Sequence, residues 1–342
     1  MSAGIAAHGT TSASGLSHAI TDVPHMSGAT PSDQSNVHRI RPTCDWVAVV
    51  NPVAGHGQCG RRALAVIEVL CRQGLSVSVR TTGFAGEGVQ IVREVVAQGF
   101  RNLLAVGGDG TANEVVNGIA QAGAVGSVRF ATLPLGTSNS FLRDFGQQEV
   151  DRAVAAIVRG DAPPCDLLRC RISLDGELRE HWALNNIIVG FGANVGALMN
   201  RRLKFLGKAG YSAGVVIEVA RLTAPRMILE LDGAAIDQPV TMVNVANSQF
   251  TGGNMHISPG ALVDDGLFDV LIIERLTRRQ LLNAFPLIFS GRHVTHPLVR
   301  LVKGRRMVLS TERPLPLLID GDIIGATPLE VEVVPAALRV IR

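Results

Sequence analysis

The sequence predicts an α/β domain built on a parallel sheet, followed by a second, mainly antiparallel β domain. Three apolar runs, at residues 46–50, 103–106 and 128–133, each end in a polar turn that contains glycine. The first two lead directly into helical spacing of apolar residues, which is the strand–turn–helix alternation of a parallel sheet. After residue 165 the chain changes to short β segments separated by turns, which indicates the second domain.

With 342 residues, the chain is long enough for two domains, each with its own core. Residues 1–40 are rich in Ser, Gly, Ala, Thr and His and cannot bury enough apolar surface to fold, so we expect a disordered tail. The α/β domain is expected over residues 44–164, with residues 326–342 placed to complete its sheet. The β-rich second domain is expected over residues 165–325.

Each element of the first domain is predicted from a short apolar run or from helical periodicity. Strands are read where apolar residues run together and end at a turn, and helices where apolar residues recur every three or four positions. The predicted strands are residues 46–50, 75–82, 103–106 and 128–133. The predicted helices are residues 61–70, 86–98, 111–120 and 151–159.

The second domain is predicted from its β segments and two helical stretches. The β segments are residues 166–173, 181–189, 227–231, 240–246, 267–273, 306–310 and 315–319, with a terminal strand at 329–334 and 338–341. Helices are expected at 208–222 and 277–289. The apolar stretch 281–289, flanked by Arg278, Arg279 and Arg292, is either a core helix kinked at Pro286 or a segment that docks on a lipid surface.

The central motif of the chain is the sequence GGDGT, from Gly107 to Thr111. Glycines let backbone N–H groups approach a ligand, and the following helix start favours an anion, so this turn suits a phosphate. A bare carboxylate at Asp109 would repel phosphate unless a divalent cation such as Mg²⁺ lies between them. The alternative is an ordinary strand–turn–helix junction in which Thr111 caps the helix.

Composition excludes several classes of function. A net charge of +3 and 4% aromatic residues argue against a nucleic-acid partner. The five cysteines form no C-x-x-C pair, so we expect reduced thiols in a cytoplasmic protein. No apolar run reaches the roughly 18 residues that a bilayer span needs, and no signal peptide is recognised. A homodimer is allowed by the sequence without being indicated by it.

The order of the motifs resembles that of the diacylglycerol kinase catalytic-domain family, which includes bacterial lipid kinases and the sphingosine and ceramide kinases. The resemblance rests on Asn51-Pro52 with its glycines, the GGDGT turn, and the sequence LPLGTSN at residues 133–139. It continues through the GGNM sequence at 252–255, the turn around Asp265-Gly266, and Asp320-Gly321-Asp322. A lone GGDGT turn would also suit an NAD kinase or a phosphofructokinase, whose α/β fold is similar.

The resemblance implies that the second domain is a β-sandwich. It also implies an ATP- and Mg²⁺-dependent lipid kinase that transfers the γ-phosphate to the hydroxyl of a diacylglycerol-like lipid at a membrane surface. Its implied ATP contacts are Asn51, Thr82, Gly107, Gly108, Asp109, Gly110, Thr111, Asn113, Glu114, Gly136, Thr137 and Asn139. Its implied Mg²⁺ ligands are the carbonyls of Leu262 and Leu267 and the carboxylate of Asp265. Either Asp320 or Asp322 would accept the hydroxyl proton, with Asp109 as the third catalytic carboxylate.

Three departures from the family pattern leave alternatives open. Ser140 stands where many members have aspartate, and Asp322 stands where the family usually has glutamate. His56 replaces a basic residue, which leaves Arg61 or Arg62 as the phosphate partner. A sphingoid-base or ceramide kinase, or a catalytically silent lipid- or nucleotide-binding regulator, would also be consistent with these residues.

Overall fold

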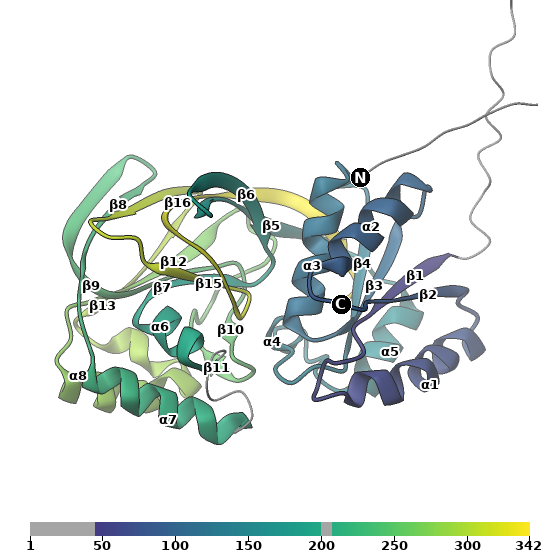
Figure 1. Ribbon diagram of the computed structural model, residues 1–342, viewed down its shortest axis with the longest axis horizontal. Helices are drawn as coiled ribbons and strands as arrows, with labels where there is room; N and C mark the ends of the chain where they lie inside the picture. Colours follow the sequence, from purple (N-terminus) through teal and green to yellow (C-terminus); the bar gives the residue numbers. More distant parts are fainter. Residues whose placement is uncertain (1–44, 200–206) are drawn as a thin grey trace, which may run out of the picture. The chain divides into compact units, whose positions relative to one another are not determined.

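The computed structural model describes residues 45–199 and 207–342, and the predicted tail at residues 1–40 lies outside them. The first half of the described chain is a parallel sheet in the order β2-β1-β3-β4 (Figure 1). Its strands are β1 (Trp46–Val50), β2 (Val77–Thr81), β3 (Asn102–Gly107) and β4 (Arg129–Pro134). All four carboxyl ends therefore lie at one edge of the sheet, where ligands bind in folds of this kind.

Helices cover both faces of this sheet because its strands are apolar on both sides. The helices are α1 (Gln58–Arg72), α2 (Glu87–Ala97), α3 (Asp109–Gln121), the short α4 (Ser140–Arg143) and α5 (Val150–Arg159). One side of β1, including Ala48 and Val50, packs with α1 and α5. Its other side, Val47 and Val49, packs with α2 and α3. Both faces of the sheet are thus buried in apolar cores.

Antiparallel strands form the second half and wrap around one core. They are β5 (Pro164–Leu174), β6 (Glu177–Ala183), β7 (Asn186–Gly190), β8 (Arg226–Leu231), β9 (Ala234–Ala246), β12 (Phe268–Glu274), β13 (Val299–Gly304), β14 (Arg306–Thr311), β15 (Pro316–Ile319) and β16 (Asp322–Val340). The pairings β9-β8-β14-β16-β15-β7-β9 close on themselves. Fully buried side chains such as Phe268, Met307 and Leu317 fill the core that these strands share. This β-sandwich-like unit beside an α/β unit confirms the predicted fold class.

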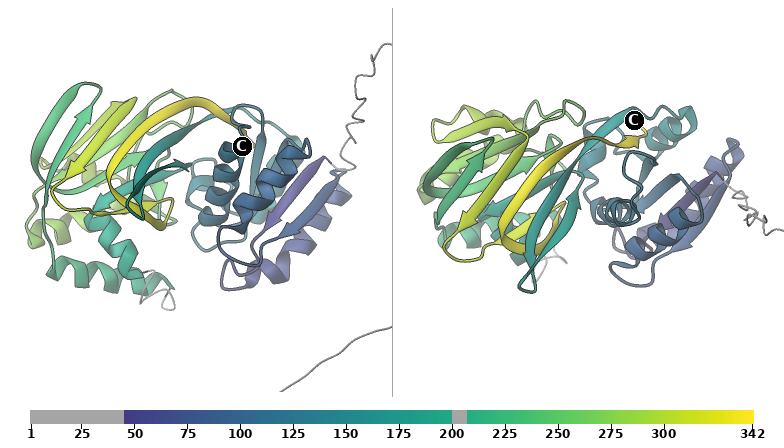
Figure 2. Two further views of the ribbon diagram at one scale, coloured as in Figure 1. Left: turned by 45° about the horizontal axis from the view of Figure 1, so that its top comes forward. Right: turned by 90° about the horizontal axis from the view of Figure 1, so that it is seen from above.

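Helices and a small hairpin cover one side of the sandwich. They are α6 (Phe191–Leu198), α7 (Gly207–Ala220), α8 (Arg278–Ala284), the 3₁₀ helices η3 (Phe285–Ser290) and η4 (Arg292–Thr295), and the hairpin β10 (Phe250–Thr251) with β11 (Met255–His256). Two views show α7 and α8 lying side by side at the edge of this unit (Figures 1 and 2). Pro286 ends the α-helical geometry, so the predicted helix 277–289 is an α-helix followed by a 3₁₀ turn.

The long strand β16 belongs to both halves. It pairs antiparallel with β5 over most of its length, and near its end Arg339 and Val340 pair parallel with Arg129 and Phe130 of β4. The 14 strands of the main sheet in the described residues are therefore continuous. The two expected pieces at 329–334 and 338–341 are one strand with an irregular register between Val334 and Leu338.

One expected strand is wrong, and two elements were not expected. Residues 181–189 do not form one strand, because the chain breaks between β6 and β7 and turns its N–H groups towards the buried carboxylate of Asp320. Strand β13 and helix α6 were not expected at all. The sequence of β13, VRLVKG, contains two basic residues on its exposed side. These residues suggested a basic surface cluster, and the strand was therefore not predicted.

Candidate active site

Two glycine-containing loops meet at the carboxyl ends of β3 and β4. A Cβ atom on Gly136 would lie 2.2 Å from the Cα atom of Gly108, so the contact requires glycine. The strands are neighbours in register, with Gly107 opposite Pro134, and the two turns therefore begin side by side. Helix α3 starts directly after Gly108, and its first N–H groups have no intrahelical partner. These groups form a site suited to a phosphate.

The loop after β1 lies against the loop after β4. A Cβ atom on Gly55 would lie 2.5 Å from the carbonyl oxygen of Leu135, and the φ angle of Gly55 is +58°. A polar hollow of about 200 Å³ is lined by Gly55, His56, Gln58, Arg62, Pro134, Leu135, Gly136 and Thr137. Of the two arginines that the sequence left open, Arg62 lines this hollow and Arg61 does not. The hollow thus combines glycine turns with one fixed cation.

Asp109 is the first residue of α3 and turns its carboxylate towards the loop after β4. Its Oδ2 atom accepts the N–H of Ser140 at 3.0 Å, and Oδ1 accepts a longer bond of 3.5 Å from the N–H of Phe141. Burial and, to a smaller extent, the nearby negative charge of Asp320 raise the pKa of this carboxyl, the backbone and side-chain hydrogen bonds from Ser140 and Phe141 lower it, and the resulting pKa is about 6. An ionised carboxylate has about four lone-pair sites, so these bonds leave room for a further ligand.

Asp320 is sealed inside the protein by four N–H donors. Its Oδ2 atom accepts bonds from the side chain of Asn113 at 2.7 Å and the N–H of Leu184 at 2.8 Å. Its Oδ1 atom accepts the N–H groups of Asn185 and Asn186, both at 2.9 Å. Burial raises the pKa of this carboxyl, and the four donors oppose that rise. The Asp320 carboxylate therefore fixes the turn between β15 and β16 to helix α3 and to the break after β6.

Asp322, two residues further on, has a different environment. It is exposed at the start of β16, and its Oδ2 atom would lie 2.9 Å from a Cβ atom on Gly110. Gly110 belongs to the first turn of α3, so the carboxylate of Asp322 lies over the end of the helix that is suited to phosphate. Of the two aspartates around Gly321, only Asp322 is open to a substrate.

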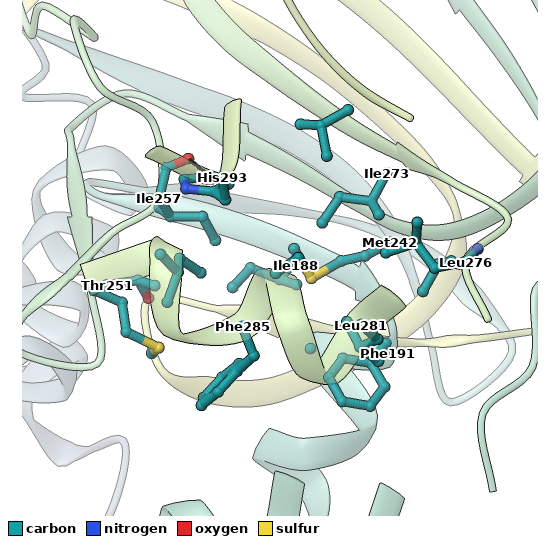
Figure 3. A pocket seen from close by; sticks show the side chains of 16 residues that line it. Ile188, Phe191, Met242, Thr251, Ile257, Ile273, Leu276, Leu281, Phe285 and His293 are labelled. Atoms are coloured by element: carbon teal, nitrogen blue, oxygen red, sulfur yellow. Dashed lines mark hydrogen bonds between the residues drawn. The ribbon is translucent and has the colours of Figure 1, made fainter. Parts of the chain in front are cut away.

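An apolar pocket lies in the second half of the chain, between the sandwich and the helices α6, α8 and η3 (Figure 3). Its lining includes Ile188 of β7, Phe191 of α6, and Leu281, Phe285 and Ile288 of α8 and η3. The pocket volume is about 60 Å³. The remaining lining residues are Gly192, Thr241, Met242, Thr251, Met255, Ile257, Ile273, Leu276, Ala284, His293 and Val299. Apart from Thr241, Thr251 and His293 the lining is apolar, which suits a lipid chain.

A short chain of contacts connects this pocket with Asp109. Thr251 and Met255 line the pocket and belong to the hairpin β10–β11. In the loop of that hairpin, the N–H of Gly253 donates to the Oγ atom of Ser140 at 2.8 Å. Ser140 in turn donates its N–H to Asp109. The hairpin therefore connects the lining of the pocket with the loop that binds Asp109.

Comparison with known proteins agrees with this arrangement. The diacylglycerol kinase catalytic domain matches residues 45–170, and the YegS C-terminal NAD kinase beta sandwich-like domain matches residues 185–342. The chain is 31% identical to the diacylglycerol kinase of Mycobacterium tuberculosis over 299 residues, which is 86% of this chain and 94% of that protein. The chain belongs to the diacylglycerol kinase family. It is a lipid kinase by family, as the order of its motifs predicts.

Other members show the same extent of likeness. The kinase is 27% identical over 272 residues to a probable lipid kinase YegS-like protein of Alcanivorax borkumensis, covering 78% of this chain and 87% of that one. The fold resembles the crystal structure of a putative diacylglycerol kinase from Bacillus anthracis, with a TM-score of 0.71 at 22% identity. That likeness covers 88% of this chain and 98% of the other.

Two residues predicted to contact ATP, Asn113 and Glu114, form hydrogen bonds with other parts of the kinase through their side chains. Asn113 donates to Asp320 and also to the carbonyl of Trp182 at 3.0 Å, so it lies behind the helix end. Glu114 accepts the N–H groups of Gly86 and Gly88 at 2.9 and 3.0 Å, at the start of α2. Both side chains hold elements around the site together.

The other predicted ATP contacts lie in or beside the three loops. Thr137 and Gly136 line the polar hollow, and Asn139 donates its side-chain N–H to the carbonyl of Gly136 at 3.2 Å. Asn51 follows β1, and its side-chain oxygen accepts the N–H of Val53 at 3.2 Å. The remaining two are buried: Thr111 packs against Gly107, and the hydroxyl of Thr82 donates to Val50 at 3.4 Å.

In the turn predicted to bind Mg²⁺, the carboxylate of Asp265 forms an ion pair with a lysine. The Oδ2 atom of Asp265 is 2.8 Å from Nζ of Lys303, which also lies 3.3 Å from Asp269. The Oδ1 atom of Asp265 accepts the N–H of Leu267 at 3.0 Å, and the side chain of Leu262 is exposed. Among the described residues, no three His, Cys, Asp or Glu side chains gather as metal ligands. Lys303 therefore balances the charge of Asp265 in this structure, and a Mg²⁺ ion at the turn stays a prediction.

A phosphate-bound Mg²⁺ fits better at the end of α3. Such an ion is held by one or two carboxylates together with the substrate's phosphates, so it needs no dedicated cage. Asp109 has spare lone pairs there, and Asp322 lies over the same helix turn.

Sequence reasoning assigned no role to three contacts that shape the site. These are the bond from Gly253 to Ser140, the ion pair of Lys303, and the N–H groups of residues 184–186 around Asp320. For the contact between Gly253 and Ser140, the sequence does contain a signal, because the GGNM motif at 252–255 predicts a glycine turn. The other two join segments far apart in sequence and leave no local pattern.

Proposed function

We propose that this kinase transfers the γ-phosphate of ATP, with Mg²⁺, to the hydroxyl of a diacylglycerol-like lipid. The observation that carries the proposal is the position of Asp322, whose carboxylate lies over the first turn of α3 where Gly108 and Gly136 meet. Phosphoryl transfer needs positioned phosphates, charge compensation and an acceptor for the hydroxyl proton. The described residues supply groups for each of these needs at the edge of one sheet.

The loops and Arg62 bind and orient the triphosphate. N–H groups at the start of α3 donate to its oxygens, and the guanidinium of Arg62 offsets negative charge in the hollow. Mg²⁺, held by Asp109 and the phosphates, would supply further compensation of the charge that develops on transfer. Asp322 accepts the proton of the lipid hydroxyl, because it is exposed while Asp320 is enclosed by four donors.

The apolar pocket receives the start of the hydrocarbon chain. Its volume of about 60 Å³ holds roughly four water-sized groups at about 15 Å³ each. A chain of ordinary length therefore displaces α8 and η3 as it enters. The hairpin β10–β11 lines the pocket and bonds to Ser140 beside Asp109, which supports the proposal that a lipid with its tail inside presents its hydroxyl to the phosphate site.

Transfer of labelled phosphate from Mg·ATP to detergent-dispersed lipids tests the proposal. Diacylglycerol, monoacylglycerol, phosphatidylglycerol, sphingosine and ceramide form the panel. We expect diacylglycerol to be labelled, and Asp322→Asn to lower kcat by about 10²–10⁴-fold, the usual contribution of a positioned base. Asp109→Asn should abolish turnover as well, because the carboxylate that holds Mg²⁺ is lost.

The matched control is Asp175→Asn, an exposed aspartate in the turn between β5 and β6, which should keep full activity. If only sphingosine or ceramide is labelled, that lipid and not diacylglycerol is the acceptor. ATP binding without transfer to any lipid would refute the proposal.

A further inference from the structure

The segment that walls the apolar pocket has a second, outward face. Leu281, Ala284 and Ile288 point into the pocket from α8 and η3. On the same elements Leu282 and Phe289 are 48% and 45% exposed. Large apolar side chains on both sides of one short helical segment are unusual for a segment that serves only as core.

The neighbouring helix α7 extends this exposed apolar face. Its residues Val216 and Ile217 are 63% and 39% exposed. The two helices contact each other, and the guanidinium of Arg278 donates to the carbonyl of Ala220 at 2.7 Å (Figure 1). We call the exposed residues of α7 and of the segment 275–295, which contains α8, η3 and η4, together the helical face.

From residue 275 onward the helical face carries positive charge and has no acidic residue of its own. Residues 275–299 contain four arginines and no aspartate or glutamate. The four are exposed: Arg275, Arg278, Arg279 and Arg292. Over the part of the chain that the structure describes, none of them forms an ion pair with a carboxylate. Their charge is therefore available to an anionic partner.

We propose that the helical face is the surface by which the kinase docks on an anionic lipid bilayer. The inference rests on the proposed function only in that a lipid kinase must meet its substrate at a membrane. Apolar side chains flanked by arginines match the interface of a bilayer, where hydrocarbon lies just beneath negative headgroups. No helix within residues 45–199 and 207–342 is long and apolar enough to cross a membrane. The contact is thus interfacial.

Docking at this face also gives lipid a short route into the protein. The inner side of the same elements lines the apolar pocket, so α8 and η3 would separate the bilayer from the pocket. A lipid chain leaving the bilayer would pass the edge of α8 and η3 to reach the residues that line the pocket.

Sedimentation with vesicles tests this surface. Vesicles of phosphatidylcholine alone are compared with vesicles that also contain phosphatidylglycerol, and we expect binding only to the latter. The double variant Arg279→Gln and Arg292→Gln should weaken binding about 25-fold, since each arginine near an anionic surface contributes about fivefold. Leu282→Ser should weaken it about tenfold.

Matched controls come from the first half of the chain. Leu64→Ser removes a leucine that is 66% exposed on α1, and Arg93→Gln removes an exposed arginine on α2; both should bind as the wild type does. Equal binding of the helical-face variants and the wild type would overturn the proposal, and so would an equal loss in the controls.

Two further readouts separate this inference from the proposed function. Kinase activity on detergent-dispersed lipid should be unchanged in the helical-face variants, whereas activity on vesicles falls with binding. If no lipid is phosphorylated but vesicle binding still requires Arg279, Arg292 and Leu282, the kinase proposal fails and the docking surface stands.

Discussion

Replacing Asp320 with asparagine should damage the stability of the kinase rather than its chemistry. Each carboxylate oxygen of Asp320 accepts two N–H bonds, at 2.7 and 2.8 Å on one oxygen and at 2.9 Å twice on the other. An asparagine side chain has only one oxygen, so in either orientation its NH₂ group faces two donors. Two bonds to a charged group are lost, at about 1.5–3 kcal/mol each, which gives a loss of about 3–6 kcal/mol.

Such a loss is a large part of the free energy of unfolding, which is about 5–15 kcal/mol for a typical protein. At roughly 2–4 °C for each kcal/mol, it should lower the melting temperature by about 10 °C or more. Urea unfolding and thermal melting of Asp320→Asn, beside Asp322→Asn, measure the difference. We expect Asp322→Asn to melt within about 2 °C of the wild type, because its side chain is exposed.

The two variants should also differ in turnover. Below its melting temperature, Asp320→Asn should retain most of its kcat, while Asp322→Asn loses it. A stable Asp320→Asn protein without turnover would show that Asp320 is the proton acceptor, and the assignment made from burial and hydrogen bonding would then be wrong.

Three further predictions concern ATP and the lipid chain. Arg62→Ala should raise the Kd for ATP about tenfold by calorimetry, with Arg61→Ala unchanged, because only Arg62 lines the hollow. Burial raises the pKa of Asp109 to about 6, so fewer molecules carry the charged carboxylate as the pH falls below 6. The kcat/KM for ATP should therefore fall on the acid side of pH 6, and Asp144→Asn should keep that profile although burial raises the pKa of Asp144 similarly. Ala284→Phe, which adds a ring inside the apolar pocket, should raise the KM for long-chain lipid and leave that for a short-chain analogue unchanged; an equal effect on both would refute the pocket assignment.

The sequence was sufficient for the parallel sheet and its loops because their signals are local. Apolar runs and glycine turns lie within a few residues of each other, and the meeting of Gly108 with Gly136 follows once β3 and β4 are neighbours. The family motifs added the β-sandwich and the kinase activity, which the comparisons confirm.

The sequence alone could not distinguish the role of Asp320 from that of Asp322. Both flank Gly321 and have the same side chain. What separates them is the ring of N–H groups from residues 184–186 and Asn113, which only the tertiary fold brings to Asp320. The same distant carboxylate broke the expected strand at 181–189, so one buried interaction accounts for both failures. The pairing of Asp265 with Lys303 across β12 and β13 was hidden for the same reason.

Strand β16 has a consequence for how the kinase is made in the cell. During synthesis, β1 to β4 leave the ribosome first, yet the edge of β4 gains its partner only when Arg339 and Val340 follow. Until then that edge is an open template for wrong pairing with other nascent chains. The aspartate expected to accept the proton, Asp322, arrives with the same strand. A chain that stops before β16 therefore lacks both the partner of the β4 edge and the carboxylate of Asp322.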